Sequence, residues 1–285
     1  MIQSDNHVHT SFSSDSSTPM EDMIIRGKSL GLSSICFTDH MDYGFPVQEN
    51  GMDFLFSVED YFSKIKELSK KHPDFQIRTG VELGLKKDVL AAALELTKEY
   101  AFDFVIGSTH LVDDIDPYDS EYWENYGEEN GIRHYYETTL QNIMEGFDYD
   151  VYGHIDYVIR YCPSMNTLQN GTGQTETFYQ KMLKENREVI DEILSTLISL
   201  GKGIEINTAG WKRGLGHPNP HEAILKRYAE LGGKMITIGS DAHETKYLAY
   251  DFAKIPTLLQ SLGFPSYTEF HGRKPLQISL LPYHS

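Results

Sequence analysis

Two histidines near the start of the chain, His7 and His9, are spaced as metal ligands could be. Residues i and i+2 of an extended segment point to the same face, so both imidazoles can reach one ion from a single strand. A solvated strand end would show the same spacing. The choice depends on whether the rest of the chain supplies further ligands at equivalent positions.

Further imidazoles and carboxylates follow short apolar segments along the chain. We expect strands at residues 34–38, 75–81, 102–107, 150–153, 203–207 and 234–239, where short runs rich in strand-forming residues end in polar or glycine residues. Residues 2–6 are short and polar, and we expect a first strand there mainly because of the histidines that follow. The candidate ligands stand at or just after the ends of these segments. They are His7, His9, His40, Glu82, His110, His154, Asp241 and His243, with Asp15 in the loop after the first strand.

Helices are expected between these strands. One begins with Thr18 as its N-cap and ends at Gly31, and others begin at Ser57 and at Asn219-Pro220. Apolar spacing predicts the remaining helices at residues 91–100, 133–147 and 175–200, followed by a last helix and a short tail. Strand and helix thus alternate seven times, which favours a parallel sheet. Seven strands suit a closed or nearly closed α/β barrel, whose active site lies at the C-terminal ends of the strands.

One segment, Leu111–Asn130, carries many acidic and aromatic side chains and shows no periodic pattern. A structureless stretch of about twenty residues in a compact domain is usually a lid, a binding loop or disorder. The aromatic residues argue against disorder, so we expect a lid or binding loop. A solvated surface excursion is the alternative.

Composition restricts the class of protein. The chain has 285 residues, of which 40% are hydrophobic, and a formal net charge of −17. We expect one domain over residues 1–285 and no binding of nucleic acid or anionic membranes. Only Cys36 and Cys162 are present, too few for a disulfide framework or a thiolate metal site. With no signal peptide and no apolar run long enough to span a membrane, the chain is expected to be cytoplasmic.

The ligand set points to more than one metal ion. Six of the twelve histidines fall among the nine candidate ligands. Imidazoles and carboxylates brought together in a pocket would be costly without a cation. Ligands without thiolate suit zinc, manganese or iron, and nine groups exceed the four to six positions of one ion. Two or three divalent transition metals are therefore expected.

These motifs resemble those of the PHP (polymerase and histidinol phosphatase) family. The family pattern H-x-H, T-D-H, G-x-E, S-x-H, G-H and S-D-A-H is present in order between residues 7 and 243. The chain length, the segment from Gly153 to Tyr161 and the segment from Glu205 to Gly210 are similar to those of monofunctional histidinol-phosphatases. The resemblance implies a distorted (β/α)7 TIM-like barrel with the metal centre at the C-terminal strand ends.

The resemblance also implies an arrangement of ligands. His7, His9, Glu82 and Asp241 would hold one metal, and Glu82 would be shared with a second metal that also takes His110 and His154. Asp15, His40 and His243 would hold a third. Glu82, Asp241 and His243 are the expected catalytic residues. The implied reaction is hydrolysis of L-histidinol phosphate in histidine biosynthesis, by attack of a metal-bridging hydroxide on phosphorus.

Basic and polar residues after the later strands are candidates for substrate binding. Arg160 can clamp a phosphate with two N–H groups, although a rim salt bridge is the alternative. Lys212 or Arg213 can add a second cation, and Trp211 leaves open which one, because the family tends to place a basic residue closer to Gly210. Asn207 and His217 are further candidates. Because histidinol phosphate also carries an ammonium group, the acidic residues between 113 and 129 are expected to recognise it.

Two other functions remain open at this point. A PHP-type phosphodiesterase or nuclease, or a phosphatase for another metabolite, would use the same ligands. The negative charge disfavours nucleic acid as a substrate. A scaffold stabilised by metal without catalysis would be expected to lack some ligands, and none is missing.

Overall fold

Seven parallel strands form the centre of the molecule. The computed structural model describes residues 2–47, 53–168 and 174–280. Its main sheet runs in the order β1–β2–β4–β5–β6–β7–β8, with the two-residue strand β3 paired to β4. The strands are β1 (Ser4–Val8), β2 (Ser34–Phe37), β3 (His40–Met41), β4 (Gln76–Gly84), β5 (Phe104–Ser108), β6 (Val151–Tyr152), β7 (Gly203–Asn207) and β8 (Ile236–Gly239).

The first and last strands of this sheet meet at the carboxyl end. Asp241 N donates to His7 O at 2.8 Å, and His9 N donates to Ala242 O at 3.0 Å. These bonds nearly close the sheet into a barrel, which confirms the predicted α/β fold class. They also bring the segment after β8 against the His7-Val-His9 segment of β1.

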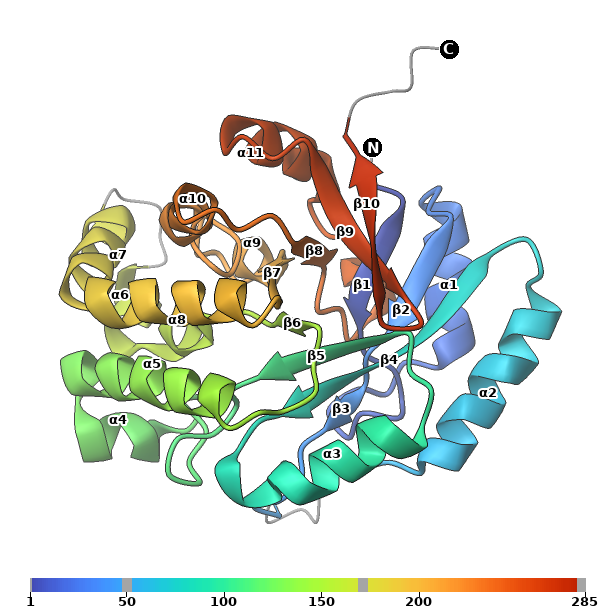
Figure 1. The fold of residues 1–285 in the computed structure, drawn as a ribbon, viewed down its shortest axis with the longest axis horizontal. Helices are drawn as coiled ribbons and strands as arrows, with labels where there is room; N and C mark the ends of the chain where they lie inside the picture. The colour runs from blue at the N-terminus through green and yellow to red at the C-terminus, as the bar shows by residue number, and fades with distance from the viewer. Residues whose placement is uncertain (1, 48–52, 169–173, 281–285) are drawn as a thin grey trace.

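Helices cover the outside of the barrel (Figure 1). In α2 (Val58–Lys71), Ser57 caps the first turn by accepting from Asp60 N at 3.3 Å, and Tyr61, Ile65 and Leu68 are buried at helical spacing. The others are α1 (Met20–Ser29), α3 (Leu90–Glu99), α4 (Ser120–Tyr126), α5 (Glu128–Met144), α6 (Pro163–Leu168), α7 (Gln174–Glu185), α8 (Arg187–Ser199), α9 (Ala209–Lys212), α10 (Glu222–Glu230) and α11 (Ile255–Ser261). None of the helices in the described ranges is long and apolar enough to cross a membrane.

Half of the expected irregular segment 111–130 is helical, so the prediction that it lacks regular structure was wrong. It contains α4 and the start of α5, and residues 111–119 and Gly127 lie outside a helix. Trp123 Nε1 donates to Pro117 O at 2.8 Å, and Tyr122 donates its hydroxyl proton to Gly131 O at 2.6 Å. The contacts of these aromatic side chains therefore stabilise a short helix, which the acidic composition of the segment did not indicate.

Three further predictions at helix ends were wrong. The helix expected over residues 175–200 divides into α7 and α8 at Asn186, whose side chain donates to Met182 O at 2.9 Å. Thr18 does not cap α1; its hydroxyl donates to His243 O at 2.8 Å. The side chain that caps α10 is that of His221, which accepts from Ala223 N, and not that of Asn219. Thr18 and Asn219 instead contact residues of the carboxyl rim.

A C-terminal hairpin was missed by the prediction of a short tail. Strands β9 (Ser266–His271) and β10 (Lys274–Ser279) pair antiparallel, and Gly272 and Arg273 between them have φ angles of +53° and +63°. Positive φ at both central residues is the turn that suits a two-residue hairpin. The hairpin packs at the amino ends of the strands, where Arg78 donates to Phe270 O and Gly272 N donates to Asp103.

Candidate metal centre

Glu82, fully buried near the end of β4, stands at the centre of the predicted ligands. Its Oε2 lies 3.1 Å from His7 Nε2, 3.4 Å from His9 Nε2 and 3.2 Å from His40 Nδ1. Its Oε1 lies 3.3 Å from His110 Nε2 and 3.0 Å from His154 Nε2. The two carboxylate oxygens thus face two different groups of imidazoles.

The first group is His7, His9 and Glu82, whose ligand atoms all lie within 4.8 Å of one another. His7 Nε2 and His9 Nε2 are 3.0 Å apart. Asp241 Oδ1 lies 3.5 Å from His9 Nε2 and 3.9 Å from His7 Nε2, as the expected fourth member of this group. The second group is Glu82, His110 and His154, as expected.

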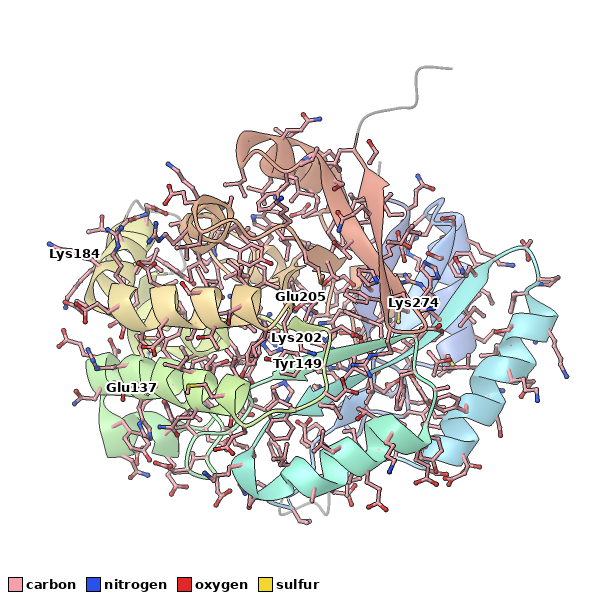
Figure 2. All side chains as sticks on the ribbon, in the orientation of Figure 1. Glu137, Tyr149, Lys184, Lys202, Glu205 and Lys274 are labelled. Carbon is pink, nitrogen blue, oxygen red and sulfur yellow. The ribbon has the colours of Figure 1, made fainter. Side chains whose placement is uncertain are left out.

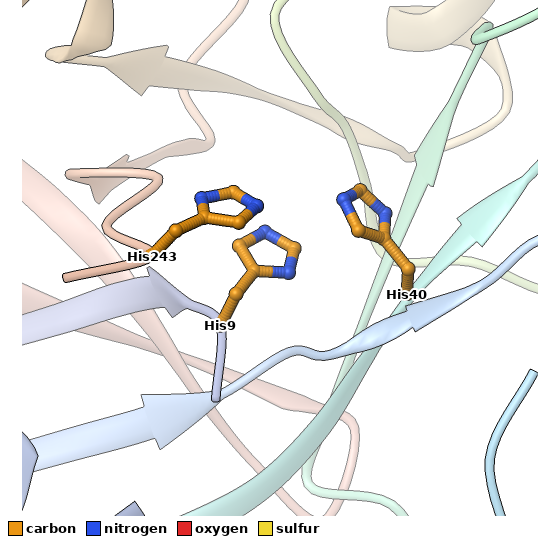
Figure 3. A group of neighbouring side chains, drawn as sticks. All are labelled: His9, His40 and His243. Carbon is orange, nitrogen blue, oxygen red and sulfur yellow. The ribbon is translucent and has the colours of Figure 1, made fainter. Parts of the chain in front are cut away.

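The third group brings together His9, His40 and His243 (Figure 3). Asp15, the expected partner of His40 and His243, lies 3.0 Å from His243 Nε2 and 3.8 Å from His40 Nε2. A fourth combination, His40, Asp42 and His110, also has ligand spacing, and Asp42 was absent from the predicted set. All nine predicted ligands therefore lie in one cluster, and the structure adds Asp42 as a tenth candidate ligand.

Buried partners fix the orientation of three histidines. His7 Nδ1 lies 2.6 Å from Glu205 Oε1, and His110 Nδ1 lies 2.6 Å from Asp42 Oδ2. Ser13 Oγ donates to Asp39 at 2.8 Å, so it accepts from His9 Nδ1 at 3.1 Å. With Nδ1 engaged, each ring turns its Nε2 toward the cluster, which is how carboxylates orient metal-binding histidines.

Sequence reasoning missed Asp42 and Glu205 as site residues. Glu205 and Asn207 are two residues apart on β7, so their side chains point to the same, inner face of the strand. Figure 2 shows Glu205 among the strands, whereas Lys184 and Glu137 project from outer helices. A buried carboxylate in a strand that is otherwise apolar was the available signal for Glu205. Asp42 follows β3 and gave no comparable pattern.

Glycines make room for the close approach of these side chains. A Cβ on Gly239 would lie 2.2 Å from His7 Cβ and 2.5 Å from Glu205 Oε1. A Cβ on Gly153 would lie 2.4 Å from Ser108 Oγ, which donates to Glu82 Oε1 at 2.7 Å. The barrel end is therefore packed so that no larger residue fits beside the ligands.

The spacing of the ligand atoms fits divalent cations. Two ligands of a tetrahedral zinc ion with bonds of about 2.0–2.1 Å lie about 3.3 Å apart. The atoms His7 Nε2, His9 Nε2 and Glu82 Oε2 are separated by 3.0, 3.1 and 3.4 Å. Unprotonated nitrogens and carboxylate oxygens at such separations repel one another unless a cation or a proton lies between them.

Without metal, protons would occupy part of this space. Burial opposes charge on His7, but Glu205, Glu82 and Asp241 outweigh burial and hold its pKa well above the ordinary value. Burial likewise opposes charge on His110, whose pKa Asp42 and Glu82 hold well above its ordinary value. Divalent cations would displace these protons, so metal binding releases protons to solvent.

The cluster opens into a pocket that also contains cationic and aromatic residues. Arg160 Nη1 donates to Asp241 Oδ2 at 3.0 Å, and its Nη2 is buried without a partner among the described residues. Arg213 lines the same pocket and lies over the ring of Tyr161 at 5.2 Å. The lining residues are Asp15, His40, Asp42, Phe45, Phe54, His110, Asp116, His154, Tyr157, Arg160, Tyr161, Arg213, Asp241 and His243.

Three predicted substrate contacts lie outside the lining of this pocket. Lys212 Nζ lies over the ring of Tyr247 at 4.5 Å, and burial lowers the pKa of Lys212. Asn207 Nδ2 donates to Asp241 Oδ2 at 3.2 Å. His217 packs against Tyr179, with 4.3 Å between the ring centroids. Of the two residues left open, the geometry therefore favours Arg213 over Lys212 as the second cation.

Comparisons with known proteins agree with this geometry. The PHP domain matches residues 5–209. The chain is 33% identical over 281 residues to the histidinol-phosphatase of Lactococcus lactis subsp. lactis strain IL1403, covering 96% of each chain. It is 30% identical to a probable histidinol-phosphatase of Thermotoga maritima, covering 97% of this chain and 99% of that protein.

Solved structures show the same relationship. A crystal structure of the Lactococcus lactis histidinol phosphate phosphatase, complexed with zinc, L-histidinol and phosphate, matches with a TM-score of 0.83 and 31% identity, over 96% of this chain and 98% of that one. The fold is also shared with a putative histidinol phosphatase of Listeria monocytogenes, with a TM-score of 0.73, 20% identity, and coverage of 88% of this chain and 99% of that one. The chain belongs to the PHP domain family.

Proposed function

We propose that this chain is a metal-dependent phosphomonoesterase that hydrolyses L-histidinol phosphate to L-histidinol and phosphate, as a step of histidine biosynthesis. The observation that carries the proposal is the buried Nη2 of Arg160, which none of the described residues pairs, in the pocket that the imidazoles and carboxylates also line. An arginine N–H beside a cation cluster suits a phosphate dianion. The identity of about one third to a histidinol-phosphatase over nearly the whole chain supports the same substrate.

Two or three divalent ions would be held by the three ligand groups around Glu82. Zinc is supported by the related zinc complex, and manganese and iron suit the same ligands. When bound, such ions supply a hydroxide near neutral pH and neutralise phosphoryl oxygens. Glu82 would hold ions on both of its oxygens, Asp241 would join the cluster to Arg160, and His243 would complete the outer group with Asp15.

Asp116 is the acidic residue that we propose to recognise the ammonium group of the substrate. It is the only residue of the acidic segment 113–129 among the described residues that line the pocket, and Tyr157 donates to its Oδ1 at 3.1 Å. Burial raises the pKa of Asp116 to about 6, so the carboxylate is mostly ionised at pH 7.5. A bound ammonium would stabilise that charge.

We further propose that the substrate is a free metabolite in the cytoplasm and that neither nucleic acid nor membrane is a partner. The net charge of −17 repels polyanions, and Cys36 and Cys162 are both free and buried, which fits a reducing compartment.

The test is phosphate release by the purified protein, with metal content measured on the same sample. L-Histidinol phosphate should be hydrolysed faster than other metabolite monoesters, and a chelator should abolish activity until zinc or manganese is restored. Arg160→Lys should lower kcat/KM by roughly tenfold or more through loss of the two-pronged contact, while Arg133→Lys on the surface of α5 should not. A fully metallated protein that releases no phosphate from any monoester, or that instead digests oligonucleotides, would contradict the proposal.

Recognition by Asp116 has its own test. Asp116→Asn should raise KM for L-histidinol phosphate by roughly tenfold and leave KM for p-nitrophenyl phosphate within about twofold, because only the first substrate carries an ammonium group. Asp119→Asn, in the same segment but exposed, is the matched control. Equal effects of Asp116→Asn on both substrates would remove Asp116 from substrate recognition.

A further inference from the structure

The guanidinium of Arg160 is held from two sides. Its Nε donates to Asn219 Oδ1 at 2.7 Å, and its Nη1 donates to Asp241 Oδ2 at 3.0 Å. The side chain is 1% exposed, and its Nη2 is the nitrogen left unpaired among the described residues. The two bonds therefore decide in which direction the free N–H groups of Arg160 point.

The amide of Asn219 can have only one orientation. Its Nδ2 donates to Asp156 Oδ1 at 2.6 Å, so its oxygen must face Arg160. Its backbone is fixed by two hydrogen bonds with Asn207, of 2.7 and 2.8 Å. A Cβ on Gly210 would lie 3.0 Å from Asn219 Oδ1, so that glycine leaves the space that the amide needs.

Asp156 is anchored in turn by two other elements. Its Oδ2 accepts from His221 N at 2.9 Å, next to α10, and from the hydroxyl of Tyr179 on α7. Asp156 and Asn219 are both fully buried, and neither lines the pocket. A continuous chain of hydrogen bonds thus runs from Asp156 through Asn219 and Arg160 to Asp241.

We propose that Asn219 and Asp156 are positioning residues, which act on the phosphoryl group of the substrate through Arg160. This inference rests on the proposed function, in which Arg160 contacts phosphate. A neutral amide holds Nε without cancelling the charge of the guanidinium, whereas a carboxylate at that position would compete with the phosphate. The carboxylate of Asp156 lies one amide farther away, where it fixes the amide and offsets the cost of burying Arg160.

The first experiment is a double-mutant cycle between positions 219 and 160. In the zinc-loaded protein, Asn219→Ala should weaken binding of inorganic phosphate, measured by calorimetry, by roughly tenfold and lower kcat/KM for L-histidinol phosphate similarly, because a hydrogen bond to a charged group is lost. In an Arg160→Ala background, the same substitution should change both quantities by less than about twofold. Asn186→Ala, at another buried asparagine that lies between α7 and α8 and does not line the pocket, should leave both unchanged.

The second experiment exchanges the polarity of the pair. Asn219→Asp alone places two carboxylates 2.6 Å apart and should weaken phosphate binding at least as much as Asn219→Ala. Adding Asp156→Asn restores a hydrogen bond between the two side chains. The amide nitrogen of the new asparagine can donate to the carboxylate at position 219, while its amide oxygen still accepts from His221 N and from the hydroxyl of Tyr179. The double variant should therefore bind phosphate more tightly than Asn219→Asp.

The outcomes separate this inference from the proposed function. Equal losses from Asn219→Ala with and without Arg160, or no recovery in the exchanged pair, would overturn the positioning role while wild-type phosphatase activity stands. A wild-type protein that is inactive on monoesters would overturn the proposed function. The calorimetric cycle with inorganic phosphate would still decide whether Asn219 acts through Arg160, and phosphate binding by the exchanged pair would decide whether Asp156 acts through Asn219.

Discussion

The two ends of strand β4 carry buried charge in opposite ways. At the amino end, Arg78 donates to Ser4 Oγ, to Asn6 Oδ1 at 2.6 Å and to Phe270 O at 3.1 Å, with Glu269 Oε2 3.7 Å away. Both terminal nitrogens of Arg78 meet acceptors there, its Nε has no partner among the described residues, and its positive charge meets a negative one. Four residues later on the same face of the strand, Glu82 faces five imidazoles whose ligand nitrogens point at its oxygens and, for His7 and His9, at each other.

The difference between the two ends indicates their roles. At the amino end the charge of the buried arginine is balanced within the chain, because the C-terminal hairpin supplies a carbonyl and a carboxylate to Arg78. At the carboxyl end, imidazole nitrogens and carboxylate oxygens face one another, and only cations or protons between them would balance this arrangement. The same strand therefore stabilises the fold at one end and provides chemistry at the other, which is the division expected of an α/β barrel.

The largest effect should come from breaking the carboxyl end. Glu82→Gln removes the charge that both ligand groups share, so we expect loss of bound metal and a fall in phosphatase activity of at least about 10³-fold. Metal analysis and phosphate release on one sample measure both. Glu95→Gln, exposed on α3, should change neither. Retention of full metal content and activity by Glu82→Gln would show that this carboxylate is not the centre of the site.

Breaking the amino end should cost stability and spare the metal. Arg78→Met leaves Glu269 without its partner, and removal of one member of a buried pair lowers the free energy of unfolding by about 3–5 kcal/mol. Urea unfolding measures this loss, and the double variant with Glu269→Gln should lose less than the two single variants add up to. If Arg78→Met kept its stability and lost metal, the separation of the two ends would be wrong.

A smaller effect is expected from the orienting carboxylate Asp42. Asp42→Asn weakens the partner of His110 Nδ1 and should lower metal affinity or kcat/KM by about 10–100-fold, as removal of such partners typically does. Metal titration separates two roles: an orienting residue weakens affinity at unchanged stoichiometry, whereas a ligand reduces the number of ions bound. Asp22→Asn in the first turn of α1 is the control.

The same contrast explains what could be predicted from sequence. Ligands such as His40 and His110 follow short apolar strands, so the strand ends placed them, and the barrel followed from seven such units. Asp42 and Asn219 act through hydrogen bonds with His110 and Arg160, which lie far away in the sequence, so no local sequence pattern indicates their roles. The C-terminal hairpin was missed because its strand β10 is mostly exposed, so little apolar alternation marks it. Recognition of the family motifs supplied the grouping of the ligands, which spacing alone left open.

The last prediction compares a histidine outside the cluster with those inside it. Burial lowers the pKa of His217 to about 4, from an ordinary value of 6.5, whereas nearby carboxylates hold the pKa of His7 well above that value. Because the folded-state pKa of His217 is the lower one, its contribution to stability is present above pH 6.5 and is lost as the pH falls toward 4.

Between pH 7.5 and 5.5 this loss amounts to about 1 kcal/mol of unfolding free energy. His217→Phe, which cannot titrate, should lose about that much less than the wild type over the same interval. Urea unfolding at the two pH values measures the difference. Identical pH dependence in wild type and His217→Phe would mean that the fold does not lower the pKa of His217, and that burial does not separate it from the histidines of the metal centre.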